Sequence, residues 1–248
     1  MRANLTLAAL ALSAVAAVSV ATPSQAGTVT TFAQYFEQKG VGADMRWVNK
    51  GSSGELMTIS SPGSTTLGAT KVDFTFLNDA FGSIKATLVL DATTSSAATG
   101  NLDQGGLTGS FDFVSTQAFT FGSTNYAAGT DLLKATFFNL SDLTGKTGGS
   151  SGGFAGSTGS GSSVLYSSGV AGALPAGPER DFSFTLTQIA PGLGYAPGHV
   201  LNGFTAASTG SFSAGGVPEP ATWGLMITGF GMLGLVARRQ RRMGAVAA

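Results

Sequence analysis

The stretch KVDFTFLN, residues 71–78, alternates between apolar and polar side chains and decides the fold class. Its apolar members Val72, Phe74 and Phe76 are two residues apart, and polar residues stand between them. In an extended chain, a period of two places alternate side chains on opposite faces. The stretch therefore predicts a β-strand with one face in an apolar core and the other in water.

The same pattern recurs along most of the chain. Alternating segments occupy residues 83–91, 109–115, 131–139, 180–189 and 203–214, and residues 44–60 predict two strands joined by a Gly/Ser turn. Segment 180–189 points Phe182, Phe184 and Leu186 inward. Roughly eight to ten short strands, with no long segment of helical period, predict an all-β body. We expect an antiparallel β-sandwich or a jelly-roll-like arrangement over residues 27–216.

Composition limits the function classes. The chain has no cysteine, which removes disulfides, thiol nucleophiles and cysteine metal ligands. Between Gly27 and Val217 it has eight Lys and Arg against twelve Asp and Glu, a net charge of about −4. An acidic body lacks the basic face that a nucleic acid requires, so we expect no nucleic-acid partner.

The first 26 residues have the organisation of a secretory signal peptide. Arg2 gives a positive start, and residues 5–20 form an uncharged run rich in Leu, Ala and Val. Small residues precede a cleavage site between Ala26 and Gly27. The sequence therefore predicts passage through the Sec translocon and removal of residues 1–26 by signal peptidase.

Residues 145–163 differ in composition from the rest of the body. Fourteen of these nineteen residues are Gly or Ser. Such a composition is typical of a flexible coil that buries little surface. We expect a Gly/Ser-rich loop or linker, and we favour a loop within the sandwich.

Several residues resemble catalytic elements only weakly. Residues 149–153 match the G-x-S-x-G pattern, but inside a Gly/Ser tract and without the expected strand and helix. Glu179 and Asp181 share one side of a predicted strand, where we expect a solvated edge, and His199 is the only histidine. The sequence thus predicts no catalytic residue, no metal site and no cofactor. A calcium ion at Asn101 and Asp103 stays an alternative.

The stretch VPEPATWGLMITGFGMLGLVARRQRR, residues 217–242, has the organisation of a membrane segment. Residues 221–237 carry no charge, and a helix of that length spans about 25 Å, slightly less than the ~30 Å apolar layer of a bilayer. Trp223 would lie at one interface. The positive-inside rule would hold the terminal arginines in the cytoplasm as a membrane stop: Arg238, Arg239, Arg241 and Arg242.

This tail resembles the PEP-CTERM sorting signal in its PEPxxW form. The resemblance is carried by Pro218, Glu219, Pro220 and Trp223, followed by the apolar span and the arginines, within residues 217–248. Gly224 differs from the alanine of the common variant. The resemblance implies an exported protein of a Gram-negative bacterium, held transiently in the inner membrane. It also implies recognition near Pro-Glu-Pro by exosortase, a membrane enzyme, and delivery to the cell surface or matrix.

Together, these features predict a non-enzymatic surface or extracellular-matrix protein, sorted by exosortase and associated with exopolysaccharide. One alternative is a secreted carbohydrate-binding module that uses exposed aromatic residues such as Trp47, Tyr126 or Tyr195. A second alternative is a secreted hydrolase that uses Glu179, Asp181 or His199.

Overall fold

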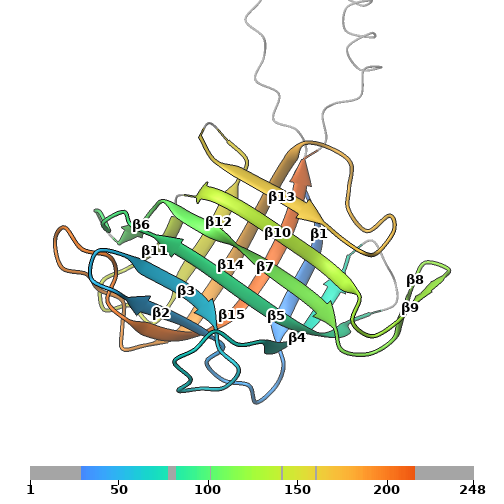
Figure 1. The fold of residues 1–248 in the computed structure, drawn as a ribbon, viewed down its shortest axis with the longest axis horizontal. Helices are drawn as coiled ribbons and strands as arrows, with labels where there is room; N and C mark the ends of the chain where they lie inside the picture. Colours follow the sequence, from blue (N-terminus) through green and yellow to red (C-terminus); the bar gives the residue numbers. More distant parts are fainter. Residues whose placement is uncertain (1–28, 78–81, 101, 141, 160, 216–248) are drawn as a thin grey trace, which may run out of the picture.

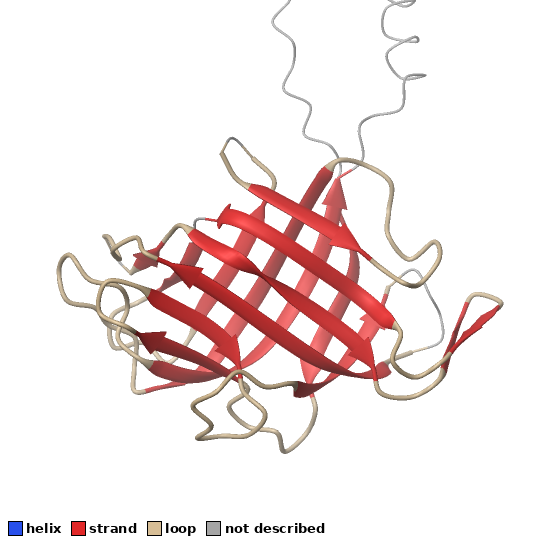
Figure 2. Cartoon of the chain, in the orientation of Figure 1, coloured by secondary structure: helices blue, strands red, loops and turns tan. Residues whose placement is uncertain are grey.

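The computed structural model describes residues 29–77, 82–100, 102–140, 142–159 and 161–215 (Figure 1). These residues form strands and loops, with no helix among them (Figure 2). The strands are β1 (Val29–Glu37), β2 (Met45–Asn49), β3 (Gly54–Thr58), β4 (Thr70–Phe76), β5 (Ile84–Thr94), β6 (Asp103–Gln104), β7 (Leu107–Ser115), β8 (Phe119–Phe121), β9 (Thr124–Tyr126), β10 (Asp131–Leu140), β11 (Asp142–Gly145), β12 (Gly152–Ser157), β13 (Ser163–Ser167), β14 (Glu179–Ala190) and β15 (Phe204–Gly215).

Two layers of antiparallel strands cross one another in Figure 1. One layer has the order β13-β10-β7-β5, and the other has the order β15-β14-β12-β11-β6. Two paths of paired strands join the layers. One runs from β5 through β3 and β2 to β15. The other runs from β5 through β4 and β1 to β15. The all-β prediction is confirmed, and both layers belong to one continuous 13-stranded sheet.

The alternation in the sequence directs the predicted side chains into the core. Val72, Phe74 and Phe76 of β4 are at most 1% exposed, and Phe182, Phe184 and Leu186 of β14 are also buried. Burial of apolar surface contributes about 25 cal/mol per Å², so each of these side chains stabilises the fold by roughly 1.5–3 kcal/mol. Among the described phenylalanines, Phe36 and Phe138 face solvent, and Phe119 and Phe121 are half-buried.

The Gly/Ser tract differs from the sequence prediction. Within residues 145–163, β12 pairs with β11 and β14 in the interior of the sheet. Phe154, the only aromatic residue of the tract, is fully buried, with ring centroids 5.2–5.7 Å from those of Phe137, Phe182 and Phe184. The loop or linker prediction is therefore wrong for β12. One large inward side chain and paired backbone suffice to hold a strand that composition alone classifies as coil.

Trp47 packs directly over Gly54 of the neighbouring strand. A Cβ atom at Gly54 would overlap the six-membered ring of Trp47. The indole is fixed from the other directions, because its Nε1–H donates to the Leu201 carbonyl oxygen at 2.9 Å and its ring stacks on Phe204. The hydrogen bond and the stacking therefore oppose a shift of the indole away from an added Cβ.

We expect Gly54→Ala to lower the free energy of unfolding by about 1–3 kcal/mol, the usual cost of overpacking a core. Urea denaturation followed by circular dichroism measures the change. Gly153→Ala in β12 is the control, because the nearest atom to its added Cβ lies 3.8 Å away, at ordinary contact distance. Equal stability of the two variants would contradict the packing of Trp47.

Candidate functional site

The two ends of the body lie side by side. Val29, the first residue of β1, pairs with Gly215, the last residue of β15. The expected signal cleavage at Ala26 and Gly27, the sorting residues 218–223 and the arginines from 238 onward lie outside the described residues. Pro218 follows Gly215 by three positions in the sequence.

The hydrolase candidates are held apart by β14. Glu179 and Asp181 lie at the beginning of this strand, whereas His199 follows its other end. Twelve residues of strand extend about 36 Å, so the histidine is far from the two carboxyl groups. Burial, and then the charge of Glu179, raise the pKa of Asp181. Glu179 is exposed and Asp181 is half-buried, but the predicted edge position is wrong, because β14 lies between β12 and β15.

The three aromatic candidates for sugar binding have other roles in the structure. Trp47 is 1% exposed, so its predicted role as an exposed stacking platform is wrong. Tyr126 accepts a hydrogen bond from the Ala171 backbone N–H at 3.0 Å and stacks on Phe119. The hydroxyl of Tyr195 donates to the Gly100 carbonyl oxygen at 2.9 Å. The structure does not bring these three residues together on one surface.

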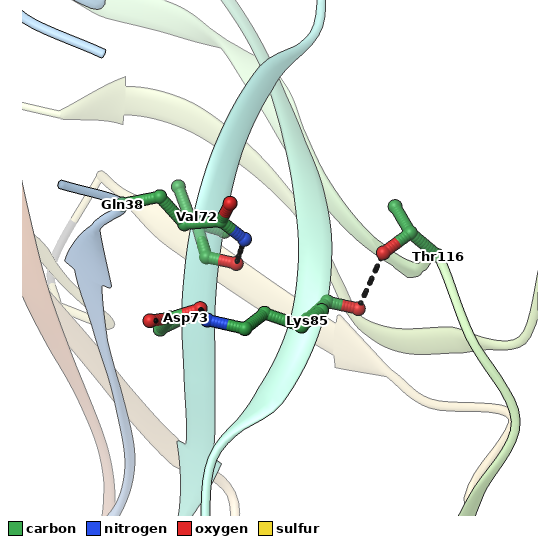
Figure 3. Close-up of polar contacts among 5 residues, drawn as sticks. All are labelled: Gln38, Val72, Asp73, Lys85 and Thr116. Atoms are coloured by element: carbon green, nitrogen blue, oxygen red, sulfur yellow. Dashed lines mark hydrogen bonds and ion pairs between the residues drawn. The ribbon is translucent and has the colours of Figure 1, made fainter. Parts of the chain in front are cut away.

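A polar groove lies where β4, β5 and the turn after β7 meet. It has a volume of about 320 Å³ and is lined by Gln38, Lys71, Lys85, Ala86, Thr116 and Gln117. Register places Asp73 of β4 opposite Lys85 of β5. Figure 3 shows the Lys85 ammonium group on the Asp73 carboxylate, with Nζ–O distances of 2.6 and 2.9 Å.

The walls of this groove are fixed by backbone contacts. Gln38 Nε2 donates to the Val72 carbonyl oxygen at 3.0 Å (Figure 3). Thr116 donates twice to the carbonyl oxygen of Lys85, from its backbone N–H at 2.8 Å and from its hydroxyl at 3.0 Å. Among the described residues, no carboxylate forms an ion pair with Lys71, which is exposed. The groove is thus a positively charged patch on an acidic body.

A second hollow adjoins the groove at Gln117, which lines both. It has a volume of about 280 Å³ and is lined by Phe76, Gly82, Ser83, Ile84, Gln117, Ala118, Phe119 and Thr120. Phe76 is buried, and Phe119 of the β8–β9 hairpin is half-buried. The combined surface therefore has a cationic end and an aromatic end. The sequence does not predict this surface, because its residues come from separate segments of the chain. The strand register and the turn after β7 bring these segments together.

A buried carboxyl group occupies the region between β2 and β15. Asp44 is fully buried, and its Oδ2 accepts a hydrogen bond from the Ser208 hydroxyl at 2.9 Å. Ser208 in turn accepts one from the Tyr35 hydroxyl at 2.8 Å. Burial raises the pKa of Asp44 to about 7. Because Oδ1 has no hydrogen-bond partner among the described residues, the ionised form is poorly compensated.

The described part of the chain has neither a cluster of metal-ligating side chains nor a membrane-spanning helix. No three His, Cys, Asp or Glu side chains gather there as metal ligands would. None of the described residues forms a helix long and apolar enough to cross a membrane. The predicted span at 221–237 lies outside these residues.

Comparison with known proteins places one feature. The family model for the PEP-CTERM protein-sorting motif matches residues 216–242. Searches of curated proteins and of solved structures found no match. The described residues form an all-β body, and the chain carries a PEP-CTERM sorting motif at residues 216–242. The motif indicates an exported protein directed to exosortase.

Proposed function

We propose that this protein is a non-enzymatic component of the cell surface or extracellular matrix, released from its membrane-anchored precursor by exosortase. The sorting motif at residues 216–242 is the observation that carries the proposal. Export begins at the Sec translocon and signal peptidase, and sorting ends outside a Gram-negative cell. The separation of His199 from Glu179 and Asp181 along β14 supports a non-enzymatic role.

The proposal includes association with exopolysaccharide. The folded body is acidic overall, yet its polar groove presents Lys71 and Lys85 beside amide and hydroxyl groups. Such groups hydrogen-bond to sugar hydroxyls and attract negatively charged sugars. Co-sedimentation of the mature protein with exopolysaccharide purified from the producing strain tests this part, and a protein that stays wholly in the supernatant contradicts it.

We expect the mature protein to lack both the signal peptide and the tail. In a strain that has exosortase, intact-mass spectrometry should give a chain that begins at Gly27 and ends near Pro218–Pro220, without Trp223 and the arginines. A variant with Pro218, Glu219 and Pro220 all replaced by alanine should keep the tail, because the recognition sequence is lost while the membrane span remains.

A strain without exosortase is the matched control, and it should accumulate the uncleaved precursor of the unaltered chain. A mature mass that includes Arg242 in the strain with exosortase would overturn the processing proposal. Loss of the tail in the triple-alanine variant would show that cleavage does not depend on the Pro-Glu-Pro sequence.

A further inference from the structure

The groove and the hollow that meet at Gln117 form one surface with two chemically different ends. Lys71 and Lys85 lie at one end, and Phe119 lies at the other. Gln117 is exposed between them and can both donate and accept a hydrogen bond through its side-chain amide. A ligand that fits must therefore offer negative charge, hydroxyl groups and an apolar face within a short distance.

The cationic end can bind one anionic group. Asp73 holds the ammonium group of Lys85 in place and offsets its charge. Lys71 keeps three donors and an unbalanced positive charge, because no described carboxylate pairs with it. Gln38 has its Nε2 on the Val72 carbonyl oxygen, so its Oε1 can accept a hydrogen bond from a ligand hydroxyl. The end thus matches one carboxylate flanked by hydroxyl groups.

The aromatic end is suited to a sugar ring. Phe119 is half-buried and is braced by Tyr126, at a centroid distance of 5.2 Å and an interplanar angle of 15°. An aromatic ring fixed in this way gives an apolar contact surface at little cost in conformational entropy. A pyranose ring has apolar C–H faces and polar edges, which match Phe119 and Gln117 respectively.

We propose that this surface binds a short segment of an acidic polysaccharide, with a uronic-acid carboxylate at Lys71 and a neighbouring sugar ring on Phe119. The proposal rests on the exopolysaccharide association described above and specifies its ligand class. An acidic peptide would satisfy Lys71 but lacks the hydroxyl-rich ring, so the oligosaccharide fits more of the groups present.

The test uses full-length protein in detergent and a fluorescently labelled oligogalacturonate as the probe, read by fluorescence polarisation. We expect saturable binding that weakens as salt is added, because the contact at Lys71 is ionic. Lys71→Gln should weaken binding about tenfold, the effect of losing one charge-assisted contact. Phe119→Ala should also weaken it when binding is measured well below the melting temperature of the variant.

Lys134→Gln is the matched control. Lys134 lies on β10, outside the groove, where its Nζ is 3.8 Å from Asp112 Oδ2. Lys134→Gln removes the same charge as Lys71→Gln. Because Lys134 lies outside the groove, we expect the affinity for the probe to stay unchanged. Equal weakening by Lys71→Gln and Lys134→Gln would mean non-specific charge attraction and would overturn the proposal. Equally tight binding of a labelled poly-glutamate peptide, or of a neutral oligoglucan of the same length, would overturn it as well.

Failure of the groove proposal can be distinguished from failure of the proposed function. If the mature protein co-sediments with the native exopolysaccharide and Lys71→Gln does so equally, the association stands and the groove is not its site. If neither the probe nor the native polymer binds, both proposals fail.

Discussion

As the pH rises from about 4 to about 8, we expect the free energy of unfolding to fall, with Asp44 as the largest single cause. The carboxyl group is buried, and its pKa is raised from 3.8 to about 7 in the folded protein. The folded protein therefore binds the Asp44 proton more tightly than the unfolded chain does. The protonated Asp44 carboxyl group stabilises the folded protein fully at pH values below the pKa of the unfolded chain. This stabilisation is lost as the pH rises through the pKa of the folded protein. About three pKa units correspond to about 4 kcal/mol.

Other carboxyl groups act in the same direction. Burial also raises the pKa of Glu37, Asp91, Asp112 and Asp181, so each favours the folded protein at lower pH. These groups are largely solvated, and solvent screening makes their contributions smaller. Asp44 differs from them because it is fully buried, so no solvent screens its charge; an oxygen without a hydrogen-bond partner among the described residues is a feature that it shares with Asp91 and Asp112.

Asp44→Asn isolates the contribution of this one group. An asparagine cannot ionise, so the fall in stability between about pH 4 and about pH 8 should become shallower by most of the 4 kcal/mol. Urea denaturation at several pH values measures both curves. Asp181→Asn, the same chemical change at a carboxyl group that is largely solvated and whose pKa burial also raises, should reduce the slope much less than Asp44→Asn does. Parallel curves for Asp44→Asn and the unaltered protein would contradict this assignment.

The parts of the fold that depend on alternation could be predicted from the sequence. In β4 and β14, large apolar residues stand at every second position, and burial follows that period. β12 could not be found in this way, because glycines occupy half of its positions and Phe154 is its only large apolar side chain. The two short strands of the β8–β9 hairpin likewise have too few residues to show a period.

Sites differ in how far their residues lie apart along the chain. The sorting motif is contiguous, so it could be read directly from the sequence, and the family match at residues 216–242 confirms the presence of the motif. The groove depends on register, which sets Asp73 opposite Lys85 and brings Thr116 to the same place. The burial of Trp47 depends on pairing with β3, which puts Gly54 beneath the indole. Neither relation is visible before the strands are paired.

Phe212→Ala should have one of the largest effects on stability of any substitution in the body. Phe212 is fully buried at the centre of the aromatic core. Its ring centroid lies 5.3 Å from those of Phe111 and Phe113 and 5.9 Å from that of Phe184. Removal of the ring loses these contacts and leaves a cavity that rigid neighbouring strands cannot fill. Such changes cost about 3–5 kcal/mol, which is a large fraction of the stability of an ordinary domain.

Two further variants separate cavity formation from general loss of a phenylalanine. Phe138→Ala makes the same chemical change at a residue that is 61% exposed, and we expect it to change the free energy of unfolding by less than about 0.5 kcal/mol. Phe212→Leu keeps much of the volume and should cost about 1–2 kcal/mol. Urea denaturation gives all three values. β15 is the last described strand before the sorting motif, and it pairs with β1, β2 and β14. Because Phe212→Ala weakens the packing of β15, this variant should also reduce the amount of mature protein outside the cell. Similar values for Phe212→Ala and Phe138→Ala would mean that the aromatic cluster does not form the core, and the two-layered fold would have to be reconsidered.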